Sequence, residues 1–286
     1  MESYMKIYEN KIYDAERALY GESDILVRDC TFAGDADGES ALKECRSVIA
    51  ERCTFFLRYP FWHDEKIKIS ECDMSESCRA PLWYTSSAEI TGSKLHAPKA
   101  LRECRAVRVC DSEIVSEEYG WMCEDVTLSH SSVSGAYLFF RTRDLVLDSV
   151  SLTGKYSLQY VERVQIKNSN LDTKDSLWHA KDVTVRDSTL RGEYLGWYCE
   201  NVTLINCKII GTQAFCYCKN LRLIDCTMED CDLAFERSEV DATVLSHVVS
   251  IKNPVKGKIR VESVGEIIRD IDGVDCEITV ACEAKR

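Results

Sequence analysis

Five charged side chains are candidates for catalysis, because they offer acid, base or cation chemistry. They are His63, Asp64, Arg102, Glu103 and Arg141. His63 and Asp64 belong to the densest titratable run of the chain, and Glu103 offers a carboxylate for acid–base catalysis. A lyase acting on a uronate needs a base and a cation that neutralises the sugar acid, and Arg102 and Arg141 suit these roles. If the protein is an enzyme, these residues predict a hydrolase or lyase acting on a polysaccharide or oligosaccharide.

Aromatic side chains form a second candidate site, suited to binding. All five tryptophans share one position of a repeated unit, and Tyr and His recur at the next position. The residue before each tryptophan position is mostly apolar, so strand alternation predicts that the tryptophan position faces outward. The same position holds Lys43, Arg102, Phe140, Gln159, Cys216 and Phe235 in other units. The expected ligand-binding residues are Trp62, Trp83, Tyr84, Trp121, Tyr160, Trp178, His179, Trp197, Tyr198 and Tyr217.

Two interpretations of this strip remain open. Flat rings stack on sugar faces, and a contiguous exposed aromatic patch marks an interaction site, so the strip predicts a carbohydrate-binding face. The alternative is a ladder of stacked rings that only stiffens a sheet. A non-enzymatic scaffold that docks a protein, or a second copy of this chain, is the alternative function.

These residues are positioned by a repeat that reads apolar, any, apolar, any, any, Cys or Ser, any, apolar. The units begin at Ile25, Val48, Ile67, Ala88, Val107, Val126, Leu145, Val164, Val183, Val202 and Leu221. From Val107 onward each unit begins 19 residues after the one before it. A fixed period over most of a chain predicts a solenoid, in which neighbouring units bury a shared core.

Each unit has the pattern of short strands rather than of a helix. Val202 and Leu204 alternate with polar residues, and Gly211 provides a turn nine residues after the unit start. Three short strands and three turns in about 19 residues predict one coil of a right-handed parallel β-helix, an all-β solenoid. A leucine-rich repeat also fits the spacing of the pattern, but its first position needs a bulky leucine where this chain has small or polar residues such as Asp64.

The repeat predicts a single domain over residues 1–286. We expect about eleven coils over residues 25–239, an N-terminal cap over 1–24 and irregular closing strands over 240–286. Longer early intervals predict loops at 33–40 and 74–80, which are expected to border a binding face. Coils lie about 4.8 Å apart, so Glu44 and Glu103, three coils apart, are separated by about 14 Å. That distance exceeds the spacing of a glycosidase carboxyl pair.

The cysteines are interpreted as small core residues. The chain has 16 cysteines, and many share a repeat position with Ser, Thr, Ala or Val, for example Cys207 with Ser188. A position that accepts all of these selects for small size rather than for a thiol. Cys216 and Cys218 form a C-x-C motif without a partner at zinc-ligand spacing. We therefore expect no metal and no cofactor, and free thiols suit a reducing compartment.

Composition limits the partners. A net charge of -12 argues against nucleic acid and against an anionic membrane surface. The first residues lack the basic-then-apolar pattern of a secretory signal, and no apolar stretch is long enough to span a membrane. The expected location is the cytoplasm, and the expected partner is a glycan or another small polar ligand, with homo-oligomerisation through the strip as the alternative.

Several stretches resemble one known family. They are Lys99–Cys104, Gly154–Val161, Leu171–His179, Gly192–Tyr198, Met228–Phe235, Ile251–Pro254 and Gly265–Asp270. They resemble a bacterial family of unknown function with a pectin-lyase-like, single-stranded right-handed β-helix. The resemblance extends from about Ala18 to Asp270 and implies the fold and a cytoplasmic bacterial setting. It implies no activity, so no catalytic residue is transferred from it.

Overall fold

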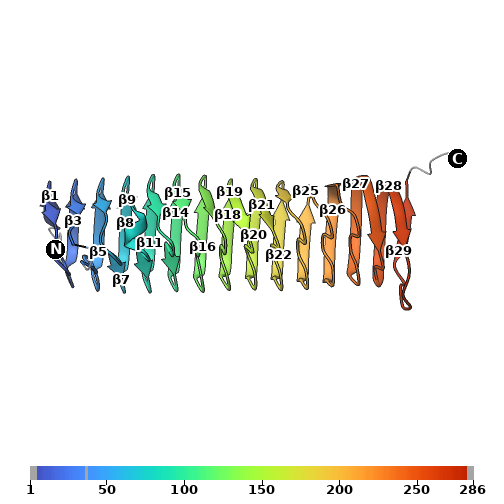
Figure 1. Ribbon diagram of the computed structural model, residues 1–286, viewed down its shortest axis with the longest axis horizontal. Coiled ribbons are helices and arrows are strands. Elements are labelled where there is room, and N and C mark those ends of the chain that lie inside the picture. The colour runs from blue at the N-terminus through green and yellow to red at the C-terminus, as the bar shows by residue number, and fades with distance from the viewer. Residues whose placement is uncertain (1–4, 36–37, 282–286) are drawn as a thin grey trace. The chain divides into compact units, whose positions relative to one another are not determined.

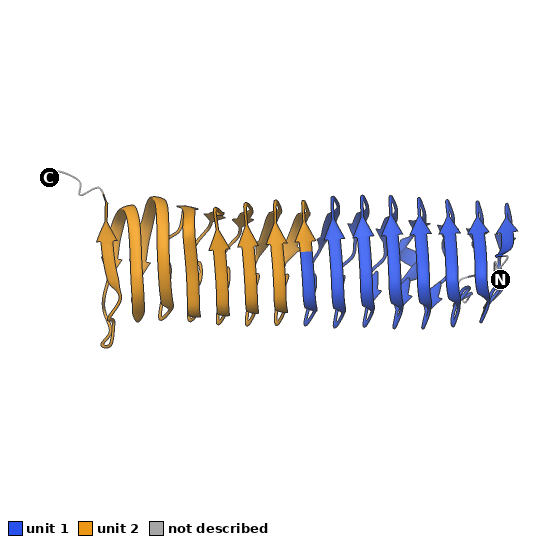
Figure 2. Cartoon of the chain, turned by 180° about the vertical axis from the view of Figure 1, so that it is seen from behind, with its two compact units in different colours: residues 1–146 blue, residues 147–286 orange. Residues whose placement is uncertain are grey.

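The computed structural model describes residues 5–35 and 38–281, and it is a parallel β-helix (Figure 1). Over these residues it has about 14 turns of ~19 residues each and almost no helix. The predicted fold class is confirmed, and the prediction of about eleven coils is too low. The chain divides into two compact units, residues 1–146 and 147–286 (Figure 2), which are described separately below.

In the first unit, equivalent strands of successive coils pair in parallel. The longer strands are β1 (Lys6–Glu9), β3 (Ser23–Arg28), β5 (Arg46–Glu51), β8 (Glu65–Ser70), β11 (Ser86–Thr91), β14 (Arg105–Cys110), β16 (Glu124–Ser129) and β18 (Arg143–Asp148), which contains the unit boundary. The second strands are β2 (Ile12–Tyr13), β4 (Thr31–Phe32), β6 (Thr54–Phe55), β9 (Asp73–Met74), β12 (Lys94–His96), β15 (Glu113–Val115) and β17 (Ser132–Gly135). A third sheet consists of β7 (Phe61–Trp62), β10 (Leu82–Trp83) and β13 (Leu101–Arg102).

The second unit repeats the arrangement. Its longer strands are β20 (Glu162–Lys167), β22 (Lys181–Arg186), β24 (Glu200–Ile205), β26 (Lys219–Glu229), β27 (Glu239–Lys252) and β28 (Lys256–Ile268), and β29 (Glu277–Val280) pairs with β28. The second strands are β19 (Ser151–Lys155), β21 (Asn170–Lys174), β23 (Thr189–Arg191) and β25 (Lys208–Ile210). The 3₁₀ helix η1 (Glu76–Cys78) lies in the first unit. Among the described residues, no helix has the length and apolar character needed to cross a bilayer.

The extra coils lie where the repeat pattern fades. In β1, Lys6 pairs with Ile25 of β3, so coiling begins before the first recognised unit. In β27, Val240 pairs with Gly257 of β28, so this coil has 17 residues instead of 19. A repeat with a fixed 19-residue period therefore does not reveal it. Both regions expected as caps therefore contain coils, apart from residues 1–4 and 282–286, which lie outside the described residues. Positions 36–37 of the expected loop at 33–40 also lie outside them.

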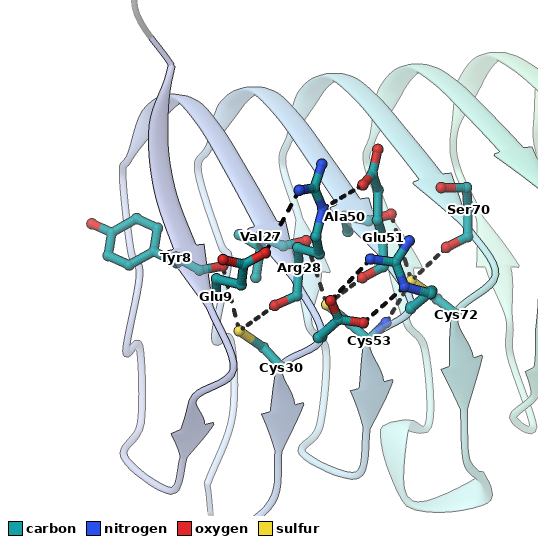
Figure 3. Close-up of polar contacts among 12 residues, drawn as sticks. Tyr8, Glu9, Val27, Arg28, Cys30, Ala50, Glu51, Cys53, Ser70 and Cys72 are labelled. Carbon is teal, nitrogen blue, oxygen red and sulfur yellow. Dashed lines mark hydrogen bonds and ion pairs between the residues drawn. The ribbon is translucent and has the colours of Figure 1, made fainter.

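The small-residue position has a polar role as well as a steric one. Cys30, Cys53 and Cys72 occupy it in successive coils, buried side by side (Figure 3). The Cys53 thiol donates to the carbonyl of Val27 in the preceding coil at 3.5 Å, and the Cys72 thiol accepts from the Cys53 N–H at 3.3 Å. Since serine serves the same way, with Ser93 Oγ accepting from Cys72 N at 3.1 Å, the position favours a short side chain that both donates and accepts, although the apolar Val150 also occupies it.

Three buried thiols at other positions of the core are also structural. All cysteines within the described residues are free, and burial raises the pKa of Cys78, Cys216 and Cys231 to about 12. A thiol with so high a pKa is neither a nucleophile nor a ready metal ligand at neutral pH. Cys110 differs, because it is the one half-buried cysteine among the described residues.

Candidate functional site

The aromatic positions lie in the segment that leads into each longer strand, which is a short strand at Trp62 and Trp83 and a turn at Trp178 and Trp197. Leu177, which precedes Trp178, is fully buried as predicted. The tryptophans themselves are half-buried rather than fully outward. His179, which follows, has a left-handed φ of 54°, as do Tyr198 (59°) and Tyr217 (60°) at the equivalent position. This conformation turns the backbone, so the rings of His179 and Tyr198 are more exposed than those of the tryptophans that precede them.

Two residues expected in the tryptophan position are buried. Cys216 and Phe235 are both 0% exposed. The N–H of Phe235 donates to the carbonyl of Ala214, while that of Phe215 donates to Leu195 in the coil before. Phe235 is therefore aligned with the inward-facing Phe215, one residue later than a 19-residue period predicts. The prediction that Phe235 belongs to the outward strip is wrong.

In the first unit the tryptophan faces are covered by rings or cations. Trp62 and Trp83 are stacked, with 5.5 Å between ring centroids and 11° between planes. The Lys43 ammonium lies 4.3 Å from the centre of the Trp62 ring. Arg102 lies between Trp83 and Trp121, at 5.7 and 5.2 Å from the ring centres. The basic residues at the tryptophan position are thus part of the ladder, through cation–π contacts.

In the second unit the tryptophans also form a ladder. Trp178 and Trp197 are stacked, with 5.5 Å between centroids and 7° between planes. Their indole N–H groups donate to the carbonyls of Tyr194 and Gln213 in the neighbouring coil, each at 2.8 Å. Covered faces and backbone hydrogen bonds are the features of a structural ladder, which supports that interpretation for the tryptophans.

A separate column of rings lies beside this ladder in the second unit, exposed at its first three positions and half-buried at Tyr217. We call it the Tyr/His column, and it consists of Tyr160, His179, Tyr198 and Tyr217. The ring centroids are 4.9, 5.1 and 4.9 Å apart along the column, and the planes are within 14° of parallel. Tyr160 and Tyr198 are 46% and 47% exposed. Because the faces cover one another, the column presents ring edges, phenol hydroxyls and an imidazole to solvent.

The first unit has no such continuous run in the equivalent positions that the structure describes. His63 meets Tyr84 edge-on, with 4.9 Å between centroids, and Tyr84 stacks on its sequence neighbour Trp83. The next coils place Glu103 and Met122 there, so the aromatic run stops after Tyr84. The predicted strip therefore differs in character between the two units.

The candidate catalytic residues are not gathered into one site. Asp64 is 1% exposed and accepts a hydrogen bond from Cys45 N at 2.7 Å, so it lies in the core while His63 lies on the surface. Burial raises the pKa of Asp64 to about 9, and the Glu44 charge adds to the effect. His63 and Glu103 are two coils apart, about 10 Å.

The candidate cations and acid have partners. Arg102 is paired with Glu118 at 3.2 Å and with Glu103 at 3.5 Å. Glu103 also accepts from the Trp83 indole N–H at 3.4 Å. Arg141 lies over its neighbour Phe140, 5.3 Å from the ring centre. Arg102 is thus already neutralised, which leaves little of its charge for a substrate carboxylate.

A hollow that the sequence did not reveal lies where the predicted loop at 74–80 projects. Its volume is ≈ 430 Å³, and its lining includes Glu76 from that loop, Pro98, Val115 and Glu117. His96, also in the lining, is 3.1 Å from Glu113 in the next coil. The expectation that this loop borders a binding face is consistent with the hollow.

Residues 6–281 match a family described as "Protein of unknown function (DUF3737)". No curated protein matches the sequence significantly. Among solved structures, the Agl-KA catalytic domain aligns at 9% identity and a TM-score of 0.44, over 84% of this chain and 60% of that one. PfbA, a surface adhesin of Streptococcus pneumoniae, aligns at 10% identity and a TM-score of 0.41, over 91% of this chain and 84% of that one. The A-module of the Azotobacter vinelandii mannuronan C-5 epimerase AlgE6 aligns at 11% identity and a TM-score of 0.38, over 98% of this chain and 89% of that one. No conclusion about function follows from alignments this remote.

Proposed function

The chain belongs to the DUF3737 family of proteins of unknown function, and we propose that it binds a carbohydrate chain, without cleaving it, along the Tyr/His column. The observation that carries this proposal is the even spacing of the column, with 4.9, 5.1 and 4.9 Å between successive rings. A regular row of polar ring edges, three phenols and one imidazole, suits a ligand that is itself a repeat of polar units. Phenol hydroxyls and an imidazole donate and accept hydrogen bonds, as sugar hydroxyls do.

Stacking favours binding because it fixes the rings in advance. Both faces of His179 are covered, by Tyr160 and by Tyr198. A side chain held in this way loses little conformational entropy when a ligand arrives. The column is therefore a rigid surface of large, amphipathic side chains, the kind that contributes contact area at low entropic cost.

The charges beside the column favour a neutral glycan. Lys181 pairs with Glu200 at 3.4 Å, and Arg163 pairs with Glu162 at 3.5 Å. These pairs neutralise the positive charges of Lys181 and Arg163, which favours a neutral glycan over a polyuronate. The four positions of the column contain no carboxylate, and the neighbouring Glu162 and Glu200 are each paired with a basic side chain, which does not favour their acting as the acid pair of a glycosidase. Binding without cleavage is the activity that these residues support.

The test is affinity electrophoresis of the full chain against neutral and acidic polysaccharides. Tyr198→Ala is expected to weaken binding to a neutral glycan about tenfold or more, which corresponds to about 1.4 kcal/mol. Tyr198→Phe keeps the ring and removes the hydroxyl. It therefore distinguishes the contribution of the hydroxyl hydrogen bond to glycan binding from that of the ring's shape. Tyr84→Ala is the matched control, since Tyr84 has the same turn position and is 43% exposed but lies outside the column. Absence of binding to every glycan, or an equal loss in both alanine variants, would overturn the proposal.

A second candidate is a protein-docking surface, favoured by one observation. The column presents ring edges rather than the open faces on which sugars usually stack, and tyrosine is enriched in protein interfaces. In this case Tyr198→Arg is expected to abolish a complex, or a dimer of this chain, seen by light scattering, while glycan electrophoresis shows no retardation for any variant.

A further inference from the structure

Cys110, Asp111 and His130 are brought together by coil stacking on the surface of the first unit. Cys110 ends β14 and pairs with Ser129, which ends β16. Asp111 and His130 follow these residues in equivalent turns of adjacent coils, with φ of 50° and 45°. The Asp111 N–H donates to the Ser129 carbonyl at 3.2 Å. The stacking therefore places His130 directly beside Asp111 in the adjacent coil.

The three side chains offer sulfur, oxygen and nitrogen donors within reach of one ion. One ligand atom from each lies within 4.8 Å of the other two. The Cys110 sulfur is 3.0 Å from an Asp111 carboxylate oxygen. No other group of three such residues comes as close in the part of the chain that the structure describes. The position of Cys110 is also distinctive, because its thiol is accessible while the other described thiols are buried.

In other coils, the aspartate at the equivalent turn position accepts a hydrogen bond from an arginine or asparagine side chain of the next coil. Asp29 is bound by Arg52 of the next coil at 2.8 Å, and Asp187 is bound by Asn206 at 2.7 Å. In the coil of Asp111 the next-coil neighbour is an imidazole and the preceding residue is a thiol. An Asp–His pair needs no thiol, so Cys110 is the residue that separates a metal site from a simple surface pair.

We propose that Cys110, Asp111 and His130 bind one Zn²⁺ ion. Thiolate and imidazole together select Zn²⁺ over Ca²⁺ and Mg²⁺, which prefer oxygen ligands. Three protein ligands leave a fourth tetrahedral position for water or an external ligand. Zinc bonds of about 2.0–2.3 Å require the three donors to draw slightly closer. His130 and Asp111 are exposed and Cys110 is half-buried, so their side chains are able to make that adjustment.

The side toward the preceding coil is open. Gly92 occupies the equivalent turn position there, and its N–H donates to the Cys110 carbonyl at 3.1 Å. A Cβ at Gly92 would meet only the Glu71 Cγ, at 3.8 Å. The absent side chain leaves space beside Asp111 for the fourth ligand of the ion. On the strand itself, Arg108 is engaged by Asp125 at 2.7 Å and does not compete for Asp111.

The experiment is Zn²⁺ titration of the full chain by calorimetry, after removal of metal with a chelator. It uses a Cys282→Ser background, because Cys282 lies outside the described residues. One ion per chain is expected, with affinity reduced at least tenfold by Cys110→Ser and by His130→Ala. His96→Ala is the matched control, since His96 also faces a carboxylate of the next coil, Glu113 at 3.1 Å, but without a thiol. Its affinity is expected to be unchanged.

A second measurement addresses the thiol itself and separates a metal site from an Asp–His pair. Mass spectrometry follows alkylation of native protein by iodoacetamide, and Cys110 is expected to react first. Zn²⁺ is expected to slow that reaction in the parent protein and to have no effect in His130→Ala. No one-to-one binding, equal binding in Cys110→Ser, or alkylation indifferent to Zn²⁺ would each overturn the proposal.

Discussion

The rings of His179 and Tyr198 lie parallel, with 5.1 Å between their centroids and 8° between their planes. Tyr160 covers the other face of the imidazole at 4.9 Å. His179 is thus held between two rings while its edge faces solvent. The same residue therefore contributes to stability through its faces and offers binding chemistry through its edge, and these two contributions can be separated by substitution.

The first prediction uses that separation. His179→Ala removes two stacking contacts and is expected to lower the free energy of unfolding by about 1–2 kcal/mol. His179→Phe keeps the stack and removes the polar edge, so it is expected to preserve stability. If the Tyr/His column binds a glycan, the same variant weakens retardation in affinity electrophoresis. Urea unfolding followed by circular dichroism measures the stability, and a destabilised phenylalanine variant would contradict the ladder.

The second prediction concerns the indole hydrogen bond of Trp197. Trp197→Phe is expected to lower the free energy of unfolding by about 1–3 kcal/mol, because it leaves the Gln213 carbonyl without its donor. Trp197→Ala is expected to cost more, about 3–5 kcal/mol, since the stack on Trp178 is also lost. Equal losses in both variants, measured in the same urea titration, would show that the stacking contributes nothing.

The third prediction concerns Gly196, which lies beside an inward ring of the next coil. Its φ is +67°, and a Cβ would lie 2.4 Å from Phe215 Cδ1. Gly21 has a similar φ of +70° with nothing within 4 Å, so Gly21→Ala measures the cost of the backbone conformation alone, about 1–2 kcal/mol. Gly196→Ala is expected to lower the stability of the protein clearly more than Gly21→Ala does, because its Cβ also clashes with Phe215. Similar losses in the two variants, measured by thermal unfolding, would mean that the ring moves aside freely.

The repeat predicted most of the core and less of the surface. Positions such as Val107 and Val126 alternate inward over a fixed period, which is visible in sequence. The first coil escaped detection because Lys6 stands where later units have an apolar residue. Strand alternation also misjudged the aromatic positions, because it does not describe a turn in which His179 adopts a positive φ. Among the proposed zinc ligands, His130 lies 19 residues after Asp111, and only alignment of the chain in 19-residue rows would have brought the two together.

The last prediction concerns Asp64, a carboxyl in a position that in other coils holds short side chains, most of them thiol or hydroxyl donors. Thr85 in the next coil donates its hydroxyl to the Phe61 carbonyl at 3.0 Å. One oxygen of Asp64 accepts from Cys45 N, while Oδ2 is buried and has no hydrogen-bond partner among the described residues. A protonated carboxyl would provide both an acceptor and a donor here, as threonine does. The pKa of about 9 that burial gives this group means that the folded protein keeps it protonated at neutral pH.

The pH dependence follows from the difference between the two states. An aspartate in the unfolded chain has a pKa of about 3.9, so between about pH 4 and pH 9 the folded state holds a proton that the unfolded state has released. Over that range Asp64 lowers the free energy of unfolding by up to about 1.4 kcal/mol for each pH unit of increase. Asparagine keeps the acceptor for Cys45 N and adds a donor without titrating. Asp64→Asn is therefore expected to match the parent near pH 4 and to exceed its stability by a growing margin up to pH 9. Urea unfolding at pH 4, 6 and 8 measures this margin, and a difference that stays constant with pH would show that the buried carboxyl titrates normally.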